Sequence, residues 1–205
     1  MKLVLASASP RRAEILRDAG FSFEVAQASL DETCLRGETA RAMTRRLAEA
    51  KVRAVAERLQ AAPEEAIVIG ADTTVEVGGR LLGKPRSAKN AREMLMKLSG
   101  KTHRVVTSVA LLRLPDGAIK TATESTRVRF ARMSPREIAA YVATAEPLDK
   151  AGAYAVQGIG GRFIERINGC YFNVVGLPLA RVYRMLVSLG WQSPRRARKG
   201  SKAAG

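Results

Sequence analysis

The segment that most constrains the fold is residues 2–12, KLVLASASPRR. It begins with Leu-Val-Leu, a short apolar run typical of a buried strand. Two serines and a proline follow, and residues 13–19 then show the apolar spacing of a helix. Pro10 suits the first helical position and Ser9 suits the N-cap. The segment therefore predicts a strand, a loop of small residues and a helix N-terminus in direct succession.

This junction has the properties of an anion-binding site. A helix N-terminus presents free N–H groups and the positive end of the helix dipole, and Ser7 and Ser9 add hydroxyl groups. Arg11 and Arg12 bring planar guanidinium groups that match phosphate oxygens. The alternative is an ordinary junction with two solvated arginines, and the chain lacks the Gly-Lys-Ser/Thr of a Walker A loop here. We interpret the segment as a phosphate-binding loop.

Length and composition indicate a globular protein. With 205 residues, 46% of them apolar and 26% charged, the chain is long enough for one domain or two small lobes that share a core. It has no apolar run of transmembrane length, about 18 residues, and no signal-peptide pattern. Its two cysteines form no CxxC pair, so neither a disulfide framework nor a cysteine zinc site is indicated. We expect a cytoplasmic protein without a membrane partner.

The net charge of +16 requires a polyanionic partner to be considered. Part of the excess lies in residues 191–205, a basic stretch that we expect to be a disordered tail after a single domain at 1–190. Aromatic residues make up only 5% of the chain and do not alternate with the basic clusters, so base stacking is not indicated. Nucleic acid is therefore expected to bind only through the tail, whereas a nucleoside triphosphate remains a suitable polyanion.

Strands and helices alternate at both ends of the chain, around a central antiparallel hairpin. Strands are predicted at residues 3–5, 21–25, 66–70, 74–77, 80–82, 102–112, 118–130 and 163–167. Helices are predicted to begin at Pro10 and to cover 38–59, 87–98, 134–144 and 177–189. Residues 150–162 are glycine-rich and indicate a loop shaped against a ligand or another backbone. The pattern predicts an α/β fold with a mixed, twisted central sheet flanked by helices.

A carboxylate follows the second apolar strand. Asp72 comes after the run AIVIG, and ligands of open α/β sheets bind beyond the carboxyl ends of the strands. If the two apolar strands are neighbours, Asp72 faces the phosphate-binding loop. A carboxylate there could hold a divalent cation or orient an attacking water. A capping role is the alternative.

Other polar residues are less specific. Glu32 follows Asp31 in a loop, Lys51 lies beside the apolar stripe of a helix, and Lys84 is held in a Gly-Lys-Pro turn. A solvated surface charge is the alternative for each. Gln157 could pair with a base edge or brace its own loop. His103 is the only histidine, which excludes mechanisms that need a histidine pair, and we expect it to make a hydrogen bond at the start of its strand.

Taken in order, these motifs resemble the Maf family of nucleoside triphosphate pyrophosphatases. The resemblance runs from residue 3 to about residue 189, and only the basic tail falls outside it. Its motifs are ASASPRR, LDET at 30–33, AEAKVRA around Lys51, GADTTV at 70–75, LGKP at 82–85, LSGKTHRV at 98–105, PLDKAGAYAVQG at 147–158 and NVVGLP at 173–178.

The resemblance implies a Maf/ITPase-like fold of two lobes around a cleft. It also implies a cytoplasmic homodimer that requires Mg²⁺ or Mn²⁺. Such an enzyme hydrolyses a non-standard or surplus nucleoside triphosphate between the α- and β-phosphates, as a house-cleaning activity, and releases the monophosphate and pyrophosphate.

Site roles follow from the same resemblance. Asp72 would be the proton acceptor for the attacking water, and Glu32 with Asp72 would hold the metal. Asp72 can do both only if that water is metal-bound. Lys51 and Lys84 would neutralise charge that develops on the phosphates. The phosphates themselves would be bound by Ser7, Ser9, Arg11 and Arg12.

Three positions distinguish the family's branches. The branch that acts on 7-methyl-GTP has tryptophan, glutamine and glutamate where this chain has Arg11, Thr73 and Gln157. These residues are similar to the branch that acts on dTTP and UTP, so we predict these pyrimidine triphosphates, with modified pyrimidines as further substrates. The alternatives are a 7-methyl-GTP pyrophosphatase and a non-catalytic protein that binds nucleic acid or regulates septum formation.

Overall fold

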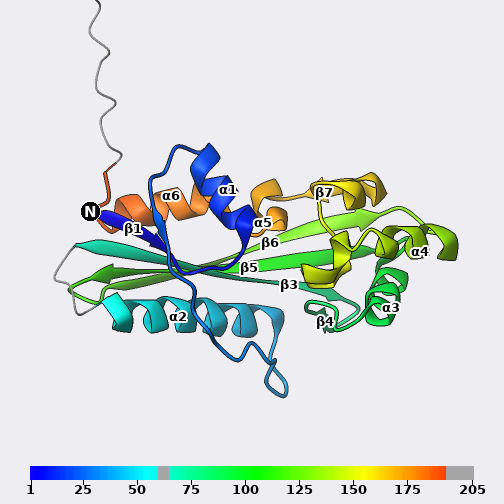
Figure 1. Cartoon of the computed structure of the whole chain (residues 1–205), viewed down its shortest axis with the longest axis horizontal. Helices are drawn as coiled ribbons and strands as arrows, with labels where there is room; N and C mark the ends of the chain where they lie inside the picture. Colours follow the sequence, from blue (N-terminus) through cyan, green and yellow to red (C-terminus); the bar gives the residue numbers. More distant parts are fainter. Residues whose placement is uncertain (60–64, 193–205) are drawn as a thin grey trace, which may run out of the picture.

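A seven-stranded mixed sheet forms the centre of the protein (Figure 1). The computed structural model describes residues 1–59 and 65–192. The strand order is β2-β1-β3-β5-β6-β7, and the short β4 pairs with β3. The strands are β1 (Lys2–Leu5), β2 (Glu24–Val25), β3 (Ala66–Val77), β4 (Arg80–Leu82), β5 (Thr102–Leu114), β6 (Ile119–Phe130) and β7 (Ile164–Asn168). β1 runs parallel to β2 and β3, and the other pairs are antiparallel, which confirms the predicted mixed sheet.

Helices cover both faces of the first half of this sheet. They are α1 (Pro10–Asp18), α2 (Ala40–Leu59), α3 (Ala88–Leu98), α4 (Pro135–Ala143), α5 (Tyr171–Val175) and α6 (Leu179–Ser188). α2 lies on one face, and α1 and α6 lie on the other (Figure 1). In β1, Leu3 and Leu5 pack toward α1 and α6, whereas Val4 packs toward α2. Burial on both faces explains why the strand is apolar throughout.

The second half of the sheet has a core of its own. There α3 and α4 pack on one face, against Val75, Val105 and Phe130. Two short 3-10 turns, Ala151–Ala153 and Ile159–Phe163, lie in the glycine-rich segment, and a third, Glu146–Asp149, directly precedes it. The two halves form two lobes, as the resemblance implied (Figure 1). The long strands β3, β5 and β6 run through both lobes and connect them.

Several element boundaries differ from the prediction. Residues 66–77 form one continuous strand rather than two, because β3 pairs with β5 from Ala66 to Glu76 without interruption. Asp72 therefore lies within a strand and not at its end. The predicted strand at 21–25 is reduced to a two-residue edge strand. The short helix α5 was not predicted, since it covers only five residues.

The C-terminal boundary also shifts. Trp191, which the sequence assigned to the tail, is buried in the core and its ring lies 5.2 Å from that of Phe21. The rest of the expected tail, from residue 193, lies outside the described residues. Within the described part of the chain, no helix combines the length and the apolarity needed to cross a bilayer.

His103 makes the hydrogen bond that was expected at the start of its strand. Its Nε2 lies 2.8 Å from the hydroxyl of Tyr154, and its ring packs edge-on against Phe130. Burial lowers the pKa of His103 from 6.5 to about 4. The folded protein therefore keeps the imidazole neutral at a pH where the unfolded chain protonates it.

We expect this buried histidine to make stability dependent on pH. As the pH falls from 6.5 to about 4, the unfolded state binds a proton that the folded state does not, and about 3 kcal/mol of the free energy of unfolding is lost. Urea unfolding of the wild type and of His103→Gln across this pH range measures the effect, because the other titratable groups contribute equally in the two proteins. If the free energy of unfolding changed with pH in the same way in both proteins, His103 would not be the cause.

Candidate active site

A cavity of about 960 Å³ lies between the two lobes. Its wall is formed by residues from five segments: the loop after β1, the middle of β3, α2, the turn after β4 and the segment after α4. Cationic residues outnumber acidic ones in this wall, which favours an anionic ligand. The cationic residues are Arg11, Arg12, Lys51, Lys84, Arg86, Lys97 and Lys150, and the acidic residues are Asp31, Glu32, Asp72 and Asp149.

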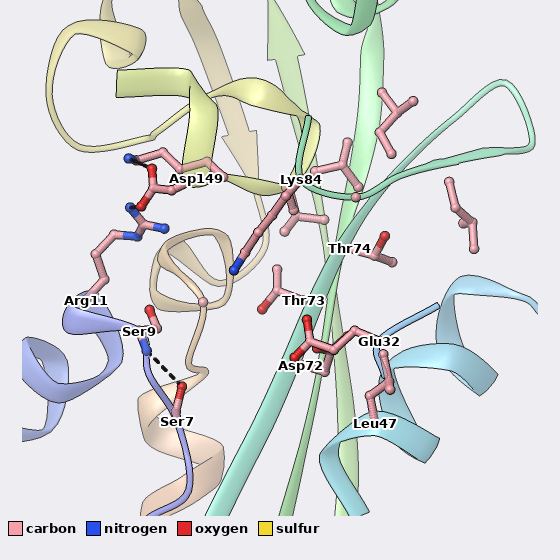
Figure 2. Close-up of a pocket in the computed structure, with 18 of the residues that line it drawn as sticks. Ser7, Ser9, Arg11, Glu32, Leu47, Asp72, Thr73, Thr74, Lys84 and Asp149 are labelled. Atoms are coloured by element: carbon pink, nitrogen blue, oxygen red, sulfur yellow. Dashed lines mark hydrogen bonds and ion pairs between the residues drawn. The ribbon is translucent and has the colours of Figure 1, made fainter. Parts of the chain in front are cut away.

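The predicted phosphate-binding loop forms one side of this cavity. Ser9 occupies the N-cap position of α1 and Pro10 its first turn, as predicted, but the Ser9 side chain makes no capping hydrogen bond. Instead its backbone N–H donates to Ser7 Oγ at 3.2 Å. The serine hydroxyl at position 9 thus remains available to a ligand, and both serines face the cavity (Figure 2).

The two adjacent arginines have different environments. Arg12 is buried and makes four hydrogen bonds: Nε to Gly176 O at 2.9 Å, Nη1 to Ser7 Oγ at 3.0 Å and Ala71 O at 2.8 Å, and Nη2 to Thr73 Oγ1 at 3.1 Å. Burial lowers its pKa, and the nearby carboxylates oppose this effect. Arg12 lines the cavity, but its hydrogen bonds join the loop after β1 to β3 and to the turn after α5.

Arg11 is the arginine that extends into the cavity (Figure 2). Its Nη1 lies 3.9 Å from Asp149, a carboxylate on the opposite lobe that also binds Lys150 at 2.5 Å. Successive helical residues point about 100° apart, so the two arginines cannot have the same environment. Sequence spacing alone did not indicate which one was buried, and it gave no reason to select Asp149.

Two carboxylates and one ammonium group meet at the centre of the site. Lys51 Nζ lies 2.6 Å from Glu32 Oε1 and 2.8 Å from Asp72 Oδ1. Lys51 and Asp72 are both more than 90% buried. Burial acts to raise the pKa of Glu32, but the hydrogen bond and charge of Lys51 outweigh it, with help from Lys84 and Arg12, and the pKa is lowered. Glu32 is therefore ionised at neutral pH.

A glycine brings these groups together. A Cβ atom at Gly70 would lie 2.7 Å from both Ala48 O and Val52 Cγ1. Since that is too close for a real Cβ contact, the glycine allows α2 to pack directly on β3. Lys51 lies between these two contact residues in α2, and Asp72 is two residues from Gly70 on the same face of β3.

The remaining predicted residues divide into two groups. Lys84 extends from the turn after β4 into the space near Ser9 and Thr73 (Figure 2). Gln157, in contrast, is exposed and is not among the residues that line the cavity. The glycine-rich segment around it is shaped by protein contacts: a Cβ at Gly152 would meet Val75, and one at Gly160 would meet the Tyr141 hydroxyl.

Sequence reasoning missed Thr74. Its hydroxyl is buried, lines the cavity and has no hydrogen-bond partner among the described residues. Because side chains two apart in a strand share a face, the continuation of β3 past Asp72 places Thr74 beside it. A prediction of one longer strand would have identified this residue.

The sequence matches the family of Maf-like proteins over residues 2–189, and the chain belongs to this family. A relative from Moorella thermoacetica named dTTP/UTP pyrophosphatase is 49% identical over 189 residues, which cover 92% of this chain and 95% of that protein. A second relative of the same name, from an Anaeromyxobacter species, is 48% identical over 200 residues, or 94% of each chain.

Similarity to a solved structure is more distant. The nucleoside-triphosphatase / dITP/XTP pyrophosphatase of Mycobacterium abscessus is 15% identical, with a TM-score of 0.41 over 92% of this chain and 97% of that one.

Proposed function

We propose that this protein is a nucleoside triphosphate pyrophosphatase that acts on dTTP and UTP in the cytoplasmic nucleotide pool. The observation that supports this most is the convergence of Glu32, Lys51 and Asp72 beside the Ser7–Ser9 loop, within one cationic cavity. A base and a set of phosphate ligands are the parts that hydrolysis of a phosphoanhydride needs. The names of the relatives support the same activity. A homodimer remains an expectation from the family resemblance.

In the proposed reaction, the triphosphate is bound by the loop serines Ser7 and Ser9, by the N–H groups at the start of α1, and by Arg11 and Lys84. The Asp72 carboxylate accepts a proton from water as the water oxygen bonds to phosphorus and the α–β phosphoanhydride bond breaks. The products are the nucleoside monophosphate and pyrophosphate. Lys51 holds the Asp72 carboxylate in place at 2.8 Å, and its charge with that of Lys84 stabilises the negative charge of the transition state.

The donor set is compatible with a divalent cation. Glu32 and Asp72 direct carboxylate oxygens to the same point, now shared with Lys51 Nζ. The described residues contain no cluster of three or more metal-ligating side chains. Mg²⁺ commonly uses one or two carboxylates together with substrate phosphates, so these two residues suit Mg²⁺ or Mn²⁺. When bound, the cation would neutralise phosphate charge and acidify bound water.

Base selectivity is proposed to depend on Arg11, Thr73 and Gln157. Thr73 Oγ1 is held by Arg12 and lies 3.0 Å from Thr107 Oγ1, so its position in the wall is well defined. Gln157 is exposed beside the cavity, and its contact with a base would require the neighbouring segment to move toward the ligand. Of the three, Gln157 is therefore the least supported by geometry.

Release of pyrophosphate from dTTP, UTP, 7-methyl-GTP and ATP, with Mg²⁺ or Mn²⁺, tests the proposal. We expect turnover of dTTP and UTP at kcat/KM values at least tenfold above those of the two purine nucleotides. A preference for 7-methyl-GTP would retain the enzyme class but reject the assignment of the three selectivity residues. No release from any nucleotide would reject the enzyme.

A further inference from the structure

The second half of the sheet has one face that no helix of the described residues covers. α3 and α4 pack against the face that carries Val105 and Val128. On the opposite face, Arg104 of β5 pairs directly with Arg127 of β6, and Arg129 of β6 pairs with Arg166 of β7. All four arginines are exposed. We call this set of four residues the distal basic face.

Few carboxylates neutralise these charges. Glu165 pairs with Arg129 at 3.3 Å, in a contact that is about half exposed on both sides and therefore weak. No ion pair joins the other three arginines to a carboxylate in the described ranges 1–59 and 65–192, although Glu76 of β3 lies opposite Arg104. Like charges directly opposite each other in a sheet are destabilising. The arrangement thus opposes folding, and an anionic partner would relieve that repulsion.

A second cavity continues this face at the end of the sheet. It has a volume of about 610 Å³ and is bordered by the ends of β3, β5 and β6 and the C-terminus of α3. Arg129 and Thr102 belong to both the cavity and the uncovered face. No acidic residue is among those described in its wall. Its cationic residues are Arg80, Lys97, Lys101 and Arg129.

We propose that the distal basic face and this cavity bind the phosphodiester backbone of nucleic acid. Guanidinium groups match phosphate oxygens in geometry and charge. An acidic protein is a weaker candidate because protein interfaces depend on apolar and aromatic anchors, and the large exposed hydrophobic residues that the structure describes lie elsewhere. The residues that border the second cavity include no aromatic side chain for base stacking, so we expect contacts to the phosphates, which do not depend on base sequence. This location differs from the tail, where nucleic-acid binding was expected.

Fluorescence anisotropy with a labelled DNA duplex tests the proposal on the full chain. The variant carries Arg104→Gln, Arg127→Gln and Arg166→Gln. The control carries Arg53→Gln, Arg136→Gln and Arg184→Gln, which remove the same charge from exposed helical positions outside the face. Both variants keep the basic tail. Before the binding measurement, each variant is shown to release pyrophosphate from dTTP at the wild-type rate. If the wild type itself has no turnover, each variant is shown to have the wild-type melting temperature instead.

We expect the wild type to bind DNA with a steep salt dependence between about 50 and about 200 mM salt. The face variant should lose about tenfold in affinity at ~0.1 M salt, and its log–log salt slope should fall by about 3, one unit for each lost phosphate contact. The control should keep the wild-type slope. The proposal would be overturned if both variants lost the same affinity or if the wild type did not bind DNA. It would also be overturned if polyglutamate displaced the labelled DNA as well as unlabelled DNA does.

Discussion

Asp72→Asn is expected to lower kcat for dTTP hydrolysis by about 10³-fold, with little change in the folded structure. The amide is isosteric but cannot accept the proton of the attacking water, and a positioned general base contributes about 10² to 10⁴ in rate. The introduced amide would still offer an oxygen to Lys51, which lies 2.8 Å from the wild-type carboxylate. Pyrophosphate release under saturating dTTP measures the effect.

Glu76→Gln is the matched control, because Glu76 lies on the same strand and the same face as Asp72 but outside the cavity. Its kcat should stay within about twofold of the wild type, as is usual for a residue with no contact to the reacting atoms.

A metal titration of the Asp72→Asn variant separates the two roles of Asp72. If high Mg²⁺ or Mn²⁺ restored the activity of this variant, Asp72 would be a metal ligand only, and its role as proton acceptor would be contradicted.

Arg12→Lys is expected to lower the free energy of unfolding by about 3 kcal/mol. The guanidinium group bonds to Gly176, Ser7, Ala71 and Thr73 at once, and an ammonium group cannot reach all of these acceptors. Each buried acceptor left without a donor costs about 1–3 kcal/mol. In a protein of this length the melting temperature should fall by about 10 °C. Urea and thermal unfolding measure both quantities.

Arg11→Lys provides the comparison within the same pair of residues. Arg11 is partly exposed and its one ion pair among the described residues, to Asp149, is long at 3.9 Å, so stability should change by no more than about 0.5 kcal/mol. Its effect should appear in the KM for dTTP, since its side chain extends into the cavity. If the two variants were equally stable, Arg12 would be a free ligand residue rather than the connection between β1, β3 and α5.

Local features of the fold could be predicted because their causes are local. The N-terminus of α1 follows from Ser9 and Pro10, and both residues occupy the expected positions. The capping box of α4, in which Ser134 and Glu137 bond to each other's backbone, needs only a serine followed by a glutamate three residues later. These contacts join residues that are close in sequence, so residue type and spacing are sufficient.

The extent of β3 could not be predicted in the same way. The residues after Gly70 are small or polar, which is typical of a strand end, but β5 supplies a partner for every residue up to Glu76. Pairing with a strand some forty residues later therefore decided that Asp72 and Thr74 lie within the sheet and share one face. Other strand pairs, β5 with β6 and β6 with β7, placed the arginines of the distal basic face opposite one another.

The sequence by itself determined the α/β class, the family and the residue types of the site, because these depend on order and spacing along the chain. Only the tertiary structure decided which of them meet. Lys51 and Asp72 are 21 residues apart, and Arg12 and Gly176 are 164 apart. Their contacts exist because α2 packs on β3 at Gly70 and because a buried guanidinium must find acceptors wherever the fold brings them.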